Sequence, residues 1–175
     1  MLLPADRRII EAQLGRELRG AVDIAHRCAC GAPDVIVTEP ELPDGTPFPT
    51  TYYLTCPVAA AAIGRLEGSG LMRAYQDQLA DESVGAAYRA AHLRYLDDRR
   101  ELAAQSGSTV PPAIEHISAG GMPDRVKCLH ALLAHSLACG PGVNPIGDAT
   151  AEQLGNWWQI APCALRWGSE SEEQS

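Results

Sequence analysis

The stretch AVDIAHRCACGAPDVIVT, residues 21–38, decides the fold predicted for this chain, because it reads as two short strands joined by a tight turn. β-Branched residues alternate in its first part and crowd its second part, which is typical of strands. Gly31 lies between the two parts and permits a sharp turn of the backbone. We therefore expect strands at residues 21–27 and 34–38.

A third strand is expected at residues 50–55, TTYYLT, after the proline-rich segment EPELPDGTPFPT, which predicts a rigid loop. In an antiparallel meander the first and third strands run in the same direction. Their ends, and with them Cys28, Cys30 and Cys56, then fall at the same edge of the sheet.

Helical patterns flank the strands on both sides, and they define the rest of the fold. They cover Pro4 to about Leu18, Pro57 to Gly68, Leu71 to Leu79, Val84 to Ala104, a helix with Pro123 and Asp124 at its start, and a short helix or turn at residues 149–158, after the expected loop GPGVNPIGD. The expected fold class is α+β, a small three-stranded antiparallel sheet near the N-terminus packed under about five helices. Residues 1–155 are expected to form one domain, and residues 156–175 a C-terminal extension with a disordered acidic end.

The net charge of −8 argues against a nucleic-acid-binding surface and against an anionic membrane, because both need an excess of Lys and Arg. Arg99 and Arg100 read as the solvated end of a helix. No apolar run has the length of a signal peptide or a transmembrane helix, so the expected location is the cytoplasm. Thiols stay reduced there, and the six cysteines indicate metal ligands or thiols rather than disulfides.

A four-thiolate metal site is the strongest functional prediction from the cysteines. Cys28, Cys30 and Cys56 are expected at one sheet edge, and Cys128 would be the fourth ligand. Four thiolates hold zinc tetrahedrally or bind an iron–sulfur cluster. The alternative is that these thiols pack as small apolar side chains.

The segment RVKCLHALLAHSLAC, residues 125–139, places Cys128 near a helix N-terminus, where the helix dipole favours a thiolate. Cys128 is therefore also a candidate nucleophile. His130 and His135 are candidates for a metal ligand, a general acid–base group or a buried, hydrogen-bonded residue. Cys128 and His135 are about 10 Å apart along a helix, too far for joint ligation, whereas His135 and Cys139 can chelate.

Arg125 and Lys127 follow the glycines of SAGGMPD just before this helix, and they are candidate anion-binding residues for a phosphate or carboxylate. The alternative is a tight turn that lets the helix pack closely.

Three stretches together, DGTPFPTTYYLTCP, ISAGGMPDRVKCLHALLAH and GPGVNPIGD, resemble the bacterial, mainly actinobacterial, family called domain of unknown function 501. The resemblance covers about residues 5–150 and implies no activity. The family pattern includes the equivalents of Cys28, Cys30, Cys56, Cys128, His130 and His135, whereas Cys139 and Cys163 fall outside it. The resemblance thus favours the four-cysteine set over the His135–Cys139 pair.

Three hypotheses follow. The first is a cytoplasmic metalloprotein with zinc, or alternatively an iron–sulfur cluster, in a structural or catalytic role. The second is an adaptor or regulatory domain that binds a protein partner. The third is a thiol enzyme with Cys128 as nucleophile. The sequence leaves open whether the chain is an enzyme, its substrate and its oligomeric state.

Overall fold

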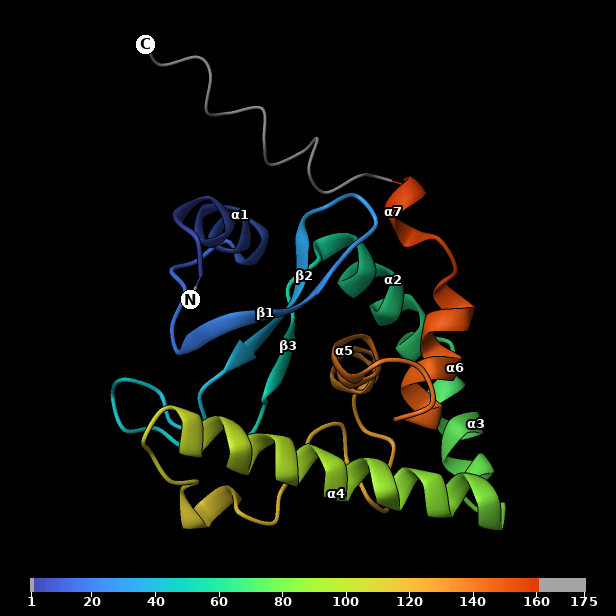
Figure 1. Cartoon of the computed structure of the whole chain (residues 1–175). Helices are drawn as coiled ribbons and strands as arrows, with labels where there is room; N and C mark the ends of the chain where they lie inside the picture. The colour runs from blue at the N-terminus through green and yellow to red at the C-terminus, as the bar shows by residue number, and fades with distance from the viewer. Residues whose placement is uncertain (1, 161–175) are drawn as a thin grey trace.

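The computed structural model describes residues 2–160, and its sheet is the predicted meander. Strands β1 (Ala21–Arg27), β2 (Pro33–Thr38) and β3 (Tyr52–Leu54) are antiparallel, with β2 in the middle. The β1–β2 turn and the end of β3 therefore lie at the same edge of the sheet (Figure 1).

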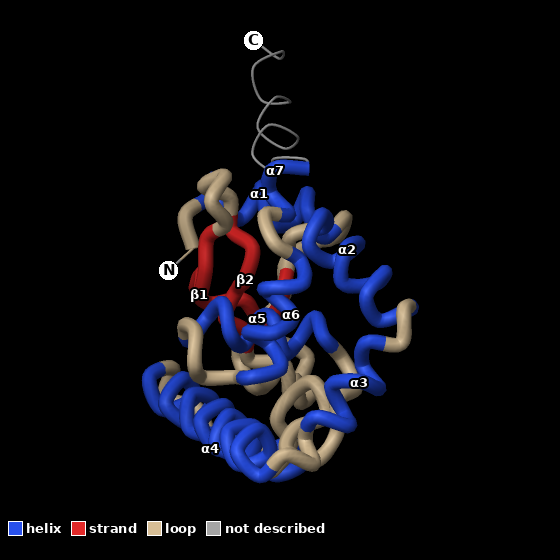
Figure 2. Tube along the Cα trace, turned by 90° about the vertical axis from the view of Figure 1, so that its right-hand side faces the viewer, coloured by secondary structure: helices blue, strands red, loops and turns tan. Residues whose placement is uncertain are grey.

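Helices surround this sheet, and the predicted α+β class is confirmed. The described helices are α1 (Pro4–Leu14), α2 (Pro57–Gly68), α3 (Leu71–Gln78), α4 (Glu82–Gln105), α5 (Leu129–Cys139), α6 (Pro145–Leu154) and the single turn α7 (Trp157–Ile160), with a 3-10 turn at Pro112–Ile114. Figure 2 shows α4 at the end of the molecule opposite α1 and α7.

Neighbouring residues of β3 point to opposite faces of the sheet, and each face packs against a different cluster of buried residues. Tyr53 packs with Ile10 of α1 and with Ile36. Tyr52 and Leu54 face the larger core, in which α5 buries Leu129, Leu132 and Leu133 completely. Helix α5 is thus the central helix of the molecule, which explains its apolar sequence.

Helix α5 starts later than predicted, at Leu129 rather than at Pro123 and Asp124. Residues 117–127 form a turn in which Arg125 N donates to Gly121 O (2.9 Å) and Lys127 N donates to Gly120 O (2.7 Å). Those two N–H groups are therefore unavailable to a helix, and the alternative reading of SAGGMPD as a tight turn describes its backbone.

Helix α6 begins inside the segment GPGVNPIGD, which was predicted as a loop. The Asn144 side chain caps the helix by accepting a hydrogen bond from Gly147 N (3.0 Å), and Pro145 occupies its first turn. Asn followed by Pro is a helix-start signal, so the loop prediction was wrong for this part.

Arg99 is not the solvated residue that the sequence suggested, since only 1% of it is exposed. Its guanidinium donates to the backbone oxygens of Ile114 (2.7 Å) and Ile117 (2.6 Å), and it also contacts Pro49 O. Arg100 does face solvent and forms an ion pair with Asp97 (2.8 Å).

Residues 161–175, with the predicted acidic end and Cys163, lie outside the described residues. The preceding helix α7 packs onto the core, where Trp157 contacts the cluster that contains Ala32, Cys56 and Ala59. None of the helices described in residues 2–160 combines the length and apolar character needed to cross a membrane.

Candidate functional site

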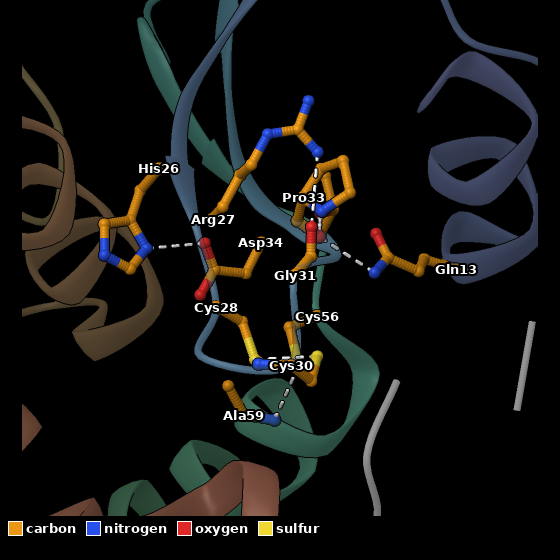
Figure 3. A network of polar contacts seen from close by, with 11 residues as sticks. Gln13, His26, Arg27, Cys28, Cys30, Gly31, Pro33, Asp34, Cys56 and Ala59 are labelled. Atoms are coloured by element: carbon orange, nitrogen blue, oxygen red, sulfur yellow. Dashed lines mark hydrogen bonds and ion pairs between the residues drawn. The ribbon is translucent and has the colours of Figure 1, made fainter. Parts of the chain in front are cut away.

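Three of the four predicted metal-binding thiols lie at one sheet edge. Cys28 and Cys30 belong to the β1–β2 turn, and their Sγ atoms are 2.9 Å apart. Cys56 caps the N-terminus of α2 directly after β3. Figure 3 shows the three cysteine side chains pointing toward one another. Burial, the hydrogen bond with Cys30 and the negative charge of Asp34 raise the pKa of the Cys28 thiol to about 12.

Cys128, the predicted fourth ligand, lies elsewhere. Within residues 2–160, two groups of three potential metal ligands have ligand atoms within 4.8 Å of one another, and neither includes Cys28, Cys30 or Cys56. Cys128 belongs to one of them, with Glu67 and His130. Cys56 caps the first turn of α2, whereas Glu67 lies eleven residues later, about 16 Å along the helix axis. The structure therefore does not assemble the predicted four-thiol set.

The Cys128 site forms where the start of α5 meets the last turn of α2. Cys128 is the N-cap residue of α5, and its Sγ lies 4.0 Å from His130 Nδ1. Glu67 Oε1 accepts a hydrogen bond from Leu129 N (2.8 Å) and lies 3.2 Å from His130 Nδ1. His130 Nε2 donates to Ala60 O (3.2 Å), so in the neutral ring Nδ1 carries the free lone pair, directed at Cys128 and Glu67.

The electrostatics of this site favour a thiolate–imidazolium pair. Burial opposes ionisation of Cys128, but the hydrogen bond to His130 and the backbone N–H of Ala131 outweigh it and lower the pKa of the thiol. The contact with Cys128, together with the charge of Glu67, raises the pKa of His130 to about 9, against burial. A thiolate paired with an imidazolium is the state of an activated nucleophile.

Cys128 and His130 open onto a cavity of about 480 Å³ between α1, β3, α2 and α5. Its wall is largely apolar and aromatic, with Leu14, Tyr53, Leu54 and Pro57, and it also contains Gln13 and Thr55. A cavity of this volume suits a small organic molecule.

His135 is far less accessible than His130, although both lie on α5. It is fully buried, and the Tyr52 and Tyr95 rings pack against it with centroids 5.8 and 5.0 Å away. Burial lowers the pKa of His135 to about 4. At neutral pH it is therefore a neutral core residue rather than the acid–base partner of Cys128.

The second ligand group, Asp98, His135 and Cys139, contains the predicted His135–Cys139 pair. Asn144 Oδ1 is held by Gly147 N, so Asn144 Nδ2 donates to His135 Nδ1 (3.2 Å). The ring proton then sits on Nε2, which leaves no lone pair there for a metal. Burial also raises the pKa of Cys139 to about 11, so its thiol is protonated at neutral pH.

Arg125 and Lys127, the candidate anion-binding residues, precede α5 and are exposed, with Val126 buried between them. Within the described part of the chain, neither residue lines the cavity beside Cys128. Arg125 and Lys127 are therefore not placed to bind a substrate in the cavity beside Cys128.

Glu67 and Asp34 were not predicted as site residues. Glu67 lies in the last turn of α2, where the helix dipole disfavours a negative charge. An acidic residue at this unfavourable position was the feature of the sequence that could have indicated a functional role. Asp34 carries no comparable signal, because an acidic residue at the start of a strand is ordinary.

Comparison with known proteins gives one result. The model of a family described as "Protein of unknown function (DUF501)" matches residues 24–152, more than half of the chain. Neither the curated proteins nor the solved structures contain a significant match.

Proposed function

This chain belongs to the DUF501 family, and we propose that it is a thiol-dependent enzyme whose nucleophile is Cys128. The observation that carries the proposal is the Cys128–His130 pair, 4.0 Å apart, at the wall of a 480 Å³ cavity. A nucleophile, a base in contact with it and a third group that orients the base are the elements of covalent catalysis. Glu67 and the carbonyl of Ala60 orient His130.

The chemistry that fits is acyl transfer. The Cys128 thiolate adds to the carbonyl carbon of an ester or thioester, and the His130 imidazolium donates its proton to the departing alcohol or thiol. Water then cleaves the Cys128 thioester, giving one proton back to His130 and releasing the acid. The apolar wall formed by Leu14, Leu54 and Pro57 favours a small substrate with an aliphatic or aromatic acyl group.

Alkylation of the folded protein by iodoacetamide between pH 5 and 9, followed by peptide mass spectrometry, tests the nucleophile. We expect Cys128 to react with a midpoint below the value of about 8.5 for a free cysteine. Cys139, with a pKa near 11, is the internal reference and stays unreacted. His130→Asn should move the Cys128 midpoint upward. Equal reactivity of Cys128 and Cys139 contradicts the proposal.

Turnover is tested with 4-nitrophenyl butyrate as the probe. We expect release of nitrophenolate and a butyryl adduct on Cys128 in the intact mass. Cys128→Ser should abolish both, and Cys139→Ser is the matched control that should retain them. Hydrolysis at the wild-type rate by Cys128→Ser rules out the catalytic role.

A second candidate is a zinc centre on the same three side chains, and their spacing favours it. Tetrahedral zinc separates a sulfur and a nitrogen ligand by about 3.6 Å, and a nitrogen and an oxygen ligand by about 3.3 Å. Here Sγ–Nδ1 is 4.0 Å and Nδ1–Oε1 is 3.2 Å, with the other nitrogen of His130 bound to a carbonyl, as in metal-binding histidines. Zinc that is lost in Cys128→Ser, together with a wild-type Cys128 that resists iodoacetamide until a chelator is added, would favour this candidate.

A further inference from the structure

A second cluster of sulfur atoms lies at the sheet edge, separate from the Cys128 cavity. Two of its thiols accept backbone hydrogen bonds: Cys30 N donates to Cys28 Sγ (3.3 Å), and Ala59 N donates to Cys56 Sγ (3.5 Å). Such bonds stabilise negative charge on sulfur. Cys28 is 4% exposed and Cys56 is fully buried. Backbone donors are thus directed at two sulfur atoms that water hardly reaches.

A buried carboxylate, that of Asp34, lies beside Cys28. Asp34 is fully buried, and its Oδ1 lies 2.7 Å from His26 Nδ1. Within the described chain its other oxygen, Oδ2, has no hydrogen-bond partner, and Figure 3 shows this oxygen on the side of Cys28. A buried carboxylate oxygen without a partner costs free energy unless a cation compensates its charge. Oδ1 has His26 as its partner, so Oδ2 is the oxygen that remains available to a cation on the side of Cys28.

We propose that Cys28, Cys30, Cys56 and Asp34 hold one zinc ion in a closed, structural site. Zn–S bonds of about 2.3 Å separate two tetrahedral thiolates by about 3.8 Å. The Cys28 and Cys30 sulfurs, 2.9 Å apart, reach that spacing by moving apart by less than about 1 Å. Among the described residues, no three of these four groups have ligand atoms within 4.8 Å of one another, so Cys56 and Asp34 must approach the pair when the ion binds. Each thiol loses its proton to solvent when it binds the ion. The set keeps three cysteines of the predicted site and replaces Cys128 by Asp34.

The choice of zinc follows from the ligands. Iron–sulfur clusters are usually held by four cysteines. Three thiolates and one carboxylate are a normal tetrahedral set for zinc, and four protein ligands leave no open position for substrate. The ion would join the β1–β2 turn to the N-terminus of α2. This role is independent of Cys128 catalysis, so either proposal can fail alone.

Zinc content of the full-length, untagged protein tests the site. We expect about one zinc per chain in the wild type and in Cys128→Ser. Asp34→Asn, which keeps the shape of the side chain, should weaken zinc binding at least about tenfold in a chelator competition. Cys28→Ser should do the same. Cys139→Ser is the matched control and should bind zinc as the wild type does.

Cobalt(II) added to the zinc-free wild type gives a second readout, which does not depend on a variant that folds. A tetrahedral thiolate site produces intense sulfur-to-cobalt charge transfer and visible bands, and these should be absent from Cys28→Ser. Less than about a tenth of a zinc per folded chain, with no cobalt bands, overturns the proposal. So does zinc that disappears in Cys128→Ser but remains in Cys28→Ser. Bound iron and sulfide overturn the assignment to zinc.

Discussion

His130 and His135 lie five residues apart on α5, yet their neighbours give them opposite chemistry. The Cys128 thiolate and Glu67 stabilise the charged form of His130 and raise its pKa to about 9. Burial between two tyrosine rings excludes the charged form of His135 and lowers its pKa to about 4. The sequence placed both histidines on an apolar helix and left the same roles open for each. Tertiary contacts separate them.

The buried His135 predicts a loss of stability in acid. Its folded pKa of about 4 lies below the usual value of 6.5, so both states are neutral at pH 7.5. As the pH falls from 6.5 toward 4, the unfolded chain binds a proton that the folded chain excludes, and the free energy of unfolding falls by up to about 3 kcal/mol. Urea unfolding at several pH values measures this change.

The variant His135→Gln should flatten that pH dependence, even if it lowers stability at pH 7.5. Substitution of the exposed His116 by Gln is the control and should leave the pH dependence unchanged. A wild-type slope that persists in His135→Gln would assign the acid sensitivity to other groups.

At the scale of elements, the strands were easier to predict than the later helices. The bounds of β1 and β2 follow the sequence pattern within one residue, because alternation and the Gly31 turn are local signals. The start of α5 and the existence of α6 depended on the turn at Gly120 and Gly121 and on the Asn144 cap. Both lie in a Gly- and Pro-rich context that reads as loop.

The close contact of α5 and α6 predicts that Gly147 tolerates no side chain. A methyl group there would collide with the backbone oxygen of Leu132 and with Ser136 Oγ. We expect Gly147→Ala to lower the free energy of unfolding by about 2 kcal/mol or more, as measured by chemical denaturation.

Gly64 is the matched control, because it is a helical glycine in α2 whose added methyl group would meet nothing within 4 Å. Gly64→Ala should be neutral or stabilise the protein by up to about 1 kcal/mol. Equal effects of the two substitutions would contradict the close packing of α5 on α6.

At the scale of the whole molecule, α2 separates two chemically different thiol sites. The first site, at the N-terminus of α2, is buried and includes Cys28 and Cys56. The second, reached by Glu67 from the last turn of α2, opens to the cavity beside Cys128. One four-thiol site was predicted, and the proposals divide it into a structural and a catalytic centre.

Arg99 of α4 connects this helix to two segments distant in the sequence, the loop before β3 and residues 114–117. Arg99→Met would remove the guanidinium donor from the backbone oxygens of Pro49, Ile114 and Ile117. The oxygen of Ile114 keeps the N–H of Ile117 as a donor, and that of Pro49 keeps the Tyr95 hydroxyl. Since an unsatisfied group costs about 1–3 kcal/mol, we expect a loss of at least about 1 kcal/mol in the free energy of unfolding. Arg100→Met, at the exposed neighbour, should change it by less than about 0.5 kcal/mol. Similar urea midpoints for the two variants would refute this role.

The sequence by itself determined the α+β class, the three strands and their meander, and the meeting of Cys28, Cys30 and Cys56 at one sheet edge. These features follow from side-chain alternation and turn residues, which act between neighbours in the chain. Only the tertiary structure decided that Cys128 joins Glu67 and His130 and that the buried Asp34 lies beside Cys28. Those partners come from separate elements, and the packing of helices on the sheet, rather than spacing along the chain, brings them together.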